Sequence, residues 1–139
     1  MNRYMTSLKP LSLSNYLLMR GTAFAAQERL SGKVIGHLLF IKQLPGEEAG
    51  IYEIGWFINQ KYWRRGFPFE ACKALINYGF ETLDLHKICA ETIDSNKSVK
   101  LMEKLGMRKE GVFCLHTLDN AGDWADLYWY AILKADWLA

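Results

Sequence analysis

The stretch from Ile51 to Met107 constrains the fold of this chain more than any other part, because it orders five local signals in one run. An apolar, β-branched segment at 51–60 predicts a buried strand. A basic turn centred on Gly66 follows it, and a long apolar helix, a second strand at 87–93 and a helix closed by Gly106 come next. Strands that alternate with helices indicate a mixed α/β fold.

The basic turn is the strongest chemical signal in the run. The segment KYWRRGFPFEA (61–71) opens the long helix, with Arg64, Arg65 and Gly66 just before its first turn. Backbone N–H groups at a helix start lack partners, and the positive end of the helix dipole lies there as well. Such a turn favours a diphosphate, so we expect a phosphorylated cofactor.

The remaining chain supplies a sheet for this helix to cover. The long helix carries apolar residues at helical spacing, namely Phe69, Cys72, Ile76, Phe80 and Leu83. Two antiparallel hairpins are predicted, one with strands at 23–29 and 34–43 and the other joining 111–118 to 124–133. A short helix is predicted before Gly21, and the side chains of Asp94, Ser95 and Asn96 are expected to begin the helix that ends near Leu105.

Composition excludes several classes of protein. The 139 residues suit one domain (1–139). Half of the residues are hydrophobic, which excludes disorder for most of the chain. A net charge of +2 without a basic run argues against nucleic acid, and no apolar segment approaches the roughly 20 residues that a membrane helix needs. We therefore expect a cytoplasmic protein. His37, His86 and His116 show neither metal spacing nor a triad pattern.

Three cysteines are predicted to be buried, reduced thiols. Cys72, Cys89 and Cys114 lie in apolar segments and lack metal-ligand spacing. The alternative, a cysteine nucleophile, is less favoured because no neighbouring residues indicate a thiolate.

Most of this pattern resembles a known family. The segments EIGWFINQKYWRRGFPFEA, LHK and EKLGM, followed by Glu110-Gly111, match the GNAT N-acetyltransferases of the RimJ/RimL type in order. The resemblance covers roughly 34–137 and is far more specific than a lone glycine motif. It implies the GNAT fold, a central twisted, mixed but mostly antiparallel sheet flanked by helices, and acetyl-CoA (coenzyme A) as cofactor.

Within the resemblance, the cofactor arm lies against the strand at 55–58, where backbone groups bind it or polarise the acetyl carbonyl. Trp63, Gly66 and Pro68 fall on the positions of the phosphate motif, but Arg64 replaces a frequent glycine and Pro68 removes an N–H. The alternative for Arg64 and Arg65 is a solvated surface turn. The implied cofactor-binding residues are Trp56, Phe57, Ile58, Trp63, Arg64, Arg65, Gly66, Phe67, Pro68, Phe69, Ser95, Asn96 and Ser98.

The catalytic candidates are polar residues beside that arm. Ser98 falls on the family's serine and could meet the departing sulfur, whereas a plain helix-start serine is the equally weighted alternative. Glu53, with Glu91 as second choice, could receive the amine proton through water, although surface ion pairing is the commoner role for each. We expect Glu70 to complement the helix dipole.

The acceptor side is the least determined by the sequence. Trp124 and Asp126 match the family's last strand pair and are candidates for acceptor binding. The N-terminal elements look shortened against the family, and a homodimer could supply the missing wall of the cleft. The predicted activity is direct acetyl transfer to a primary amine, a protein N-terminus or a small molecule such as a polyamine, amino sugar or antibiotic. A catalytically impaired GNAT-like binding or assembly module is the rival hypothesis.

Overall fold

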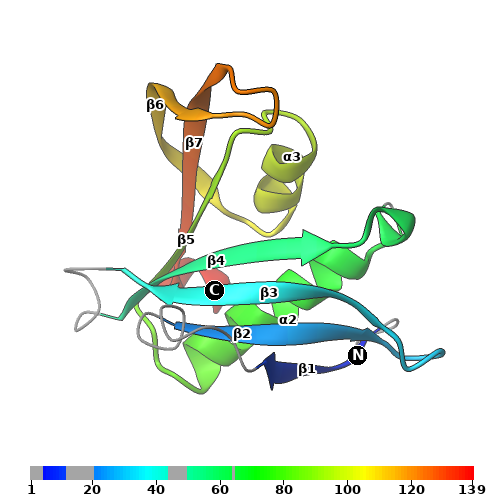
Figure 1. Cartoon of the computed structure of the whole chain (residues 1–139). Coiled ribbons are helices and arrows are strands. Elements are labelled where there is room, and N and C mark those ends of the chain that lie inside the picture. Colours follow the sequence, from blue (N-terminus) through cyan, green and yellow to red (C-terminus); the bar gives the residue numbers. More distant parts are fainter. Residues whose placement is uncertain (1–4, 12–20, 44–49, 64) are drawn as a thin grey trace.

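A computed structural model describes residues 5–11, 21–43, 50–63 and 65–139. Its strands form one seven-stranded sheet in the order β1-β2-β3-β4-β5-β7-β6 (Figure 1). The strands are β1 Met5–Leu11, β2 Gly21–Glu28, β3 Val34–Lys42, β4 Ile51–Ile58, β5 Lys87–Thr92, β6 Arg108–Leu118 and β7 Trp124–Leu133. The helices are η1 Gln60–Tyr62, a 3-10 turn, then α2 Phe67–Glu81, α3 Lys97–Lys104 and α4 Lys134–Trp137. The sheet is therefore mixed, and the predicted fold class is confirmed.

Strand pairing is antiparallel everywhere except at the centre of the sheet. There β4 and β5 run parallel and pair only at their starts, with Ile51, Tyr52 and Glu53 opposite the first three residues of β5. Beyond these three pairs the two strands diverge, and β5 continues upward beside β7 while β4 stays with β3 (Figure 1). The centre of the sheet thus opens into a wedge.

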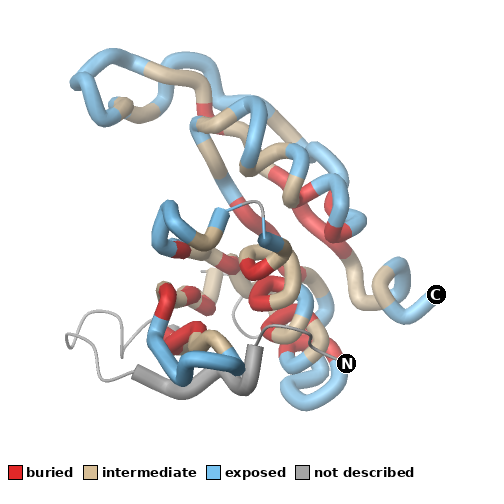
Figure 2. Tube along the Cα trace, turned by 90° about the vertical axis from the view of Figure 1, so that its right-hand side faces the viewer, coloured by how far each residue is buried: buried red, intermediate tan, exposed pale blue. Residues whose placement is uncertain are grey.

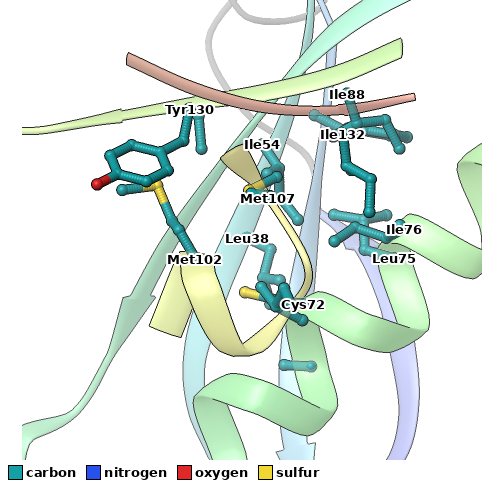
Figure 3. Close-up of a cluster of buried hydrophobic side chains, with 14 of the residues drawn as sticks. Leu38, Ile54, Cys72, Leu75, Ile76, Ile88, Met102, Met107, Tyr130 and Ile132 are labelled. Atoms are coloured by element: carbon teal, nitrogen blue, oxygen red, sulfur yellow. The ribbon is translucent and has the colours of Figure 1, made fainter. Parts of the chain in front are cut away.

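Helix α2 covers one face of the sheet and builds the core. Its buried face consists of Phe67, Ala71, Cys72, Leu75, Ile76, Gly79 and Phe80. These residues meet Leu38, Ile54 and Ile88 of the strands (Figure 3). At Gly79 an added Cβ would lie 2.8 Å from Phe40 Cζ and 2.9 Å from Ile88 Cδ1, so this position needs glycine for close helix–sheet approach. Buried residues accordingly gather in the middle of the molecule (Figure 2).

The second half of the chain packs α3 and α4 onto the same core. Met102 of α3 is fully buried and lies beside Tyr130 of β7 (Figure 3). In α4, Trp137 Nε1 donates a hydrogen bond to Asn77 Oδ1 of α2 at 2.7 Å. The far strand β6 is exposed along almost its whole length. The core therefore sits between α2, α3 and the central strands, away from the β6 edge.

One sequence prediction is wrong, a second holds in part, and the sequence does not predict one strand. Cys114 is exposed rather than buried, because β6 lies at the sheet edge. The prediction for the start of α3 is confirmed for Asp94, whose Oδ1 accepts hydrogen bonds from the N–H groups of Asn96 at 2.8 Å and Lys97 at 3.0 Å. The N-cap residue Asn96 itself makes no side-chain capping bond. Strand β1 was not predicted, since Pro10 breaks the pattern and is tolerated there only because β1 is an edge strand. The predicted helix before Gly21 lies outside the described residues.

Candidate active site

A pocket of about 830 Å³ lies where β4 ends, α2 begins and α3 begins. Its walls come from the end of β4 and the following turn, from the first residues of α2, and from one face of α3. The lining residues are Trp56, Phe57, Ile58, Asn59, Trp63, Gly66, Pro68, Phe69, Asp94, Asn96, Lys97, Ser98, Lys100, Leu101 and Lys104. The volume is within the range of small-molecule sites.

The wedge between β4 and β5 forms the inner end of this site. Residues 54–58 of β4 pair with β3 on one side, whereas the ladder to β5 stops at Glu53. Backbone N–H and C=O groups that point toward β5 beyond Glu53 therefore have no strand partner there. Trp56, Phe57 and Ile58 line the pocket at this place, so the three residues predicted to contact the cofactor arm do come together.

The predicted phosphate turn lies at the other end of the pocket. Gly66 has φ 83°, a left-handed conformation that favours glycine, and it is the N-cap of α2. The first helical hydrogen bond runs from Glu70 N to Gly66 O at 3.0 Å, so the earlier amide of Phe69 has no acceptor within the helix. Pro68 lies in the first turn, where a missing N–H costs the helix nothing. Glu70 lies in the same turn, as predicted.

Trp63 is fixed at the pocket wall by its indole. Its Nε1 donates a hydrogen bond to Ile58 O at 2.7 Å, which joins the turn to the end of β4. Asn59 Oδ1 accepts a hydrogen bond from Lys61 N at 3.0 Å and holds the intervening 3-10 turn. The turn between β4 and α2 is therefore held by hydrogen bonds between residues that are close in the sequence.

Two predicted cofactor residues of this turn point elsewhere. The Arg65 guanidinium carbon lies 5.5 Å from the Tyr62 ring centroid and 5.1 Å from that of Phe67, and Arg65 Nη2 is 3.6 Å from Glu28 Oε1. The Phe67 side chain is fully buried in the core. Neither residue lines the pocket, and Arg64 lies outside the described residues.

Ser98 is the candidate proton donor that the fold brings to the pocket. It lies in the first turn of α3 and is half-buried in the pocket wall. Asn96, the N-cap of α3, lines the pocket as well, whereas Ser95 is exposed and does not. Of these two neighbouring candidates, only Asn96 therefore contributes to the pocket wall.

The two candidate bases lie on the sheet face opposite α2. Glu53 and Glu91 alternate with Ile54 and Ala90, which are buried in the core. Glu53 Oε2 accepts a hydrogen bond from Gln43 Nε2 at 2.6 Å, and Glu91 is exposed. Neither lines the pocket. Both carboxylates thus lie on the two strands that form the wedge, β4 and β5, but on the sheet face opposite α2.

The predicted acceptor residues lie apart from these carboxylates. Asp126 Oδ1 accepts a hydrogen bond from Leu115 N at 2.8 Å, which supports a bulge of β6 where Leu115 has φ 43°. Trp124 is 63% exposed at the hairpin end. Pleat alternation puts both on the face of Tyr130, opposite Glu53 and Glu91. Asp126 therefore has a structural role that the sequence did not reveal.

Three pocket lysines were missed by the sequence reasoning. Lys97, Lys100 and Lys104 all line the pocket from α3. Their spacing of three and four residues puts them on one helix face, and this pattern could have found them. These residues do not form a continuous run of like charges, so charge runs in the sequence do not indicate them.

The buried cysteines are not set up as nucleophiles. Burial raises the pKa of Cys72 far above its usual range. Burial, and secondly the nearby Glu53 charge, raise the pKa of Cys89 to about 12, and its Sγ donates a hydrogen bond to Tyr52 O at 3.4 Å. Both thiols therefore stay protonated at neutral pH.

The described part of the chain shows neither a metal cluster nor a membrane-spanning helix. No cluster of potential metal ligands occurs among residues 5–11, 21–43, 50–63 and 65–139. Within the same described ranges, no helix is both long and apolar enough to cross a bilayer.

Known proteins share both the sequence pattern and the fold. Residues 2–108 match the family model described as an acetyltransferase (GNAT) domain. The uncharacterized N-acetyltransferase YnaD of Bacillus subtilis is 41% identical over 105 residues, which are 75% of this chain and 59% of the relative. The [ribosomal protein uS5]-alanine N-acetyltransferase of Escherichia coli is 34% identical over 106 residues, 76% of this chain and 54% of that protein.

Solved structures agree with this assignment. A GNAT-family acetyltransferase from Bacillus anthracis superposes with a TM-score of 0.71 at 36% identity, over 81% of this chain and 66% of the other. A spermidine N-acetyltransferase SpeG chimera from Vibrio cholerae and hSSAT superposes with a TM-score of 0.77 at 24% identity, over 86% of this chain and 70% of the other. At this identity the likeness shows the fold alone. The chain therefore spans about half to two thirds of the length of these relatives. With its family model, relatives and fold in agreement, the chain belongs to the GNAT acetyltransferase family.

Proposed function

We propose that this chain is an acetyl-CoA-dependent N-acetyltransferase that transfers the acetyl group directly to a primary amine. The observation that carries the proposal is the continuity of the pocket, which runs from the αL turn at Gly66 to the unpaired edge of β4. One end offers a helix start to a pyrophosphate, and the other offers a strand edge to the amides of a pantetheine arm. Bound acetyl-CoA would supply the acetyl group as an activated thioester.

The amino acids around the pocket can hold that molecule. Gly66 and the first amides of α2 would face the pyrophosphate, and the loss of one N–H at Pro68 leaves the amide of Phe69 in place. Trp56 and Phe57 line the inner end with apolar surface. Backbone amides of β4 beyond Glu53 are available to polarise the acetyl carbonyl, as in an oxyanion hole.

Proton transfer would involve both faces of the sheet. Since the cofactor pocket takes up the side of α2 and α3, we infer that the amine reaches the wedge from the face of Glu53 and Glu91. Glu53, through a water molecule, would accept the proton that the amine loses as its nitrogen bonds to the carbonyl carbon. Ser98 would donate a hydrogen bond to the sulfur as the carbon–sulfur bond breaks. Direct transfer agrees with the protonated state of Cys72 and Cys89.

The acceptor is proposed from one relative. The Escherichia coli protein named for the alanine of ribosomal protein uS5 is 34% identical over the matched region, and this favours a protein N-terminal amine. A small amine remains the second acceptor class. Incubation with acetyl-CoA and a peptide that begins with alanine, followed by mass spectrometry, should show one added acetyl group. The same peptide with a blocked N-terminus should gain none.

We further propose that two copies of the chain associate through the edge of the sheet. The edge strand β6 and its neighbour β7 expose large apolar side chains at Val112, Phe113, Leu115, Leu118 and Trp124. An edge strand offers unpaired backbone groups to a second copy of the same strand, and these apolar side chains would be covered by that pairing. Sedimentation should show a dimer, and a monomer at every concentration would exclude this association.

Cofactor binding separates an enzyme from the rival, a non-catalytic binding module. We would titrate acetyl-CoA into the chain by calorimetry and expect saturable binding with Kd on the order of micromolar. Gly66→Glu should abolish it by adding a carboxylate to the phosphate turn. Gly122→Glu is the matched control, because Gly122 has φ 85° in the β6–β7 turn and is open to solvent on its Cβ side. Absence of binding at millimolar acetyl-CoA would refute the proposal and favour the module.

A further inference from the structure

Helix α3 presents a row of ammonium groups to the pocket. Lys97, Lys100 and Lys104, which we call the lysine row, lie at positions i, i+3 and i+7 of the helix and all line the pocket. Residues at this spacing share one helix face and stack along about two turns. The row therefore forms a continuous cationic edge rather than three scattered charges.

Two members of the row are held over aromatic rings of the opposite wall. Lys97 Nζ lies 4.9 Å from the Trp63 ring centroid, and Lys104 Nζ lies 4.3 Å from that of Phe69. Such cation–π contacts orient an exposed lysine while its ammonium protons remain available to an anion. Two ammonium groups of the row are thus held over rings that flank Gly66 in the sequence.

The positive charge of the row is not balanced inside the pocket. Among the described residues that line the pocket, Asp94 is the one carboxylate, and its Oδ1 already accepts two backbone hydrogen bonds at the start of α3. Lys87 forms an ion pair with Glu110 and Lys134 forms one with Asp84, and both of these lysines lie outside the row. A local excess of cations beside a pocket attracts an anionic ligand.

The charge exceeds what a pyrophosphate at the helix start requires. The turn at Gly66 offers backbone amides and a helix dipole, which suffice for that diphosphate without side chains. A phosphate monoester carries a charge of about −1.5 to −2 and three strong acceptor oxygens, and compact ammonium groups suit it as point charges. Coenzyme A has one such group, the 3′-phosphate on its ribose.

We propose that the lysine row binds the 3′-phosphate of coenzyme A and so selects CoA thioesters over thioesters that lack this phosphate. The proposal rests on the proposed function, since it assigns a second anion subsite to the same pocket. It adds a specificity element that lies on α3, outside the phosphate turn. Binding strength at the row should also weaken as salt is added, because the lysines are exposed.

The test compares acetyl-CoA with 3′-dephospho-acetyl-CoA by calorimetry on the full chain. The wild-type chain should bind acetyl-CoA about ten- to thirtyfold more tightly, which corresponds to one or two charge-assisted contacts. A triple variant that combines Lys97→Gln, Lys100→Gln and Lys104→Gln should bind the two ligands with equal affinity. The affinity for acetyl-CoA should fall, and the affinity for 3′-dephospho-acetyl-CoA should not change. Lys109→Gln, on exposed β6 outside the pocket, is the matched control and should keep the ratio.

The outcomes separate this proposal from the one on which it rests. Equal affinity of the wild-type chain for both ligands overturns the 3′-phosphate assignment and leaves acetyl-CoA binding intact. A triple variant that weakens both ligands equally, with unchanged circular dichroism, overturns it as well. Failure of the wild-type chain to bind either ligand at millimolar concentration overturns both proposals. If the triple variant does not fold, the wild-type comparison of the two ligands still decides.

Discussion

Among single residues, Ser98 tests the proposed chemistry most directly. Ser98→Ala removes the hydroxyl from the pocket wall, and kcat should fall about tenfold or more with little change in KM, because the lost contact belongs to the departing sulfur. Steady-state kinetics with acetyl-CoA measures this. Ser95→Ala is the control, since Ser95 is exposed and outside the pocket, and its kinetics should match the wild type. Equal loss in both variants would remove Ser98 from the mechanism.

The cysteines differ in reactivity because their surroundings differ. Cys114 is exposed, whereas Cys72 and Cys89 are buried with raised pKa values, that of Cys89 at about 12. A raised thiol pKa means that the folded state disfavours the reactive thiolate. An alkylating reagent at pH 8 should therefore label one cysteine per folded chain and three after denaturation, as counted by mass spectrometry. Rapid labelling of Cys89 in the folded chain would contradict the structure.

At the scale of elements, the start of α3 depends on Asp94. Asp94→Ala removes the acceptor for two backbone N–H groups and should lower the free energy of unfolding by about 1 kcal/mol. Denaturant titration measures the change. Asp94→Asn retains a side-chain oxygen and should recover most of the loss. If Asp94→Ala were as stable as the wild type, these hydrogen bonds would contribute nothing to the helix.

Most elements could be predicted because their signals are local. The strand at Ile51, the helix after Gly66 and the hairpin of β6 and β7 follow from periodicity and turn residues, and the observed bounds are close to the predicted ones. The exposure of Cys114 could not be predicted, since an apolar strand looks the same whether it lies in the centre or at the edge of a sheet. The contact of Asp126 with Leu115 depends on a bulge, and no sequence signal indicated that bulge.

For the whole molecule, the arrangement of the site depended on pairing between distant segments. The sequence predicted the turn at Gly66 and the serine at 98, but not that β4 and β5 part after three residue pairs. That divergence follows from which strands meet, and no local pattern encodes it. The lysine row was missed for a different reason, because its spacing matters only once α3 is known to face the pocket.

The short contact between β4 and β5 also joins two half-sheets, one of β1 to β4 and the other of β5 to β7 (Figure 1). Because the pocket is lined from α2, which follows β4, and from α3, which follows β5, a ligand there would touch both halves. Amide hydrogen exchange, followed by mass spectrometry with and without acetyl-CoA, should therefore slow in peptides from both half-sheets, and most at residues 54–58. Slowing confined to the turn at Gly66 would mean that the ligand does not reach the wedge. In the free chain, that half of β4 should exchange faster than the half that is paired on both sides. The opening proposed to admit a cofactor would then also be the part of β4 that water reaches most easily.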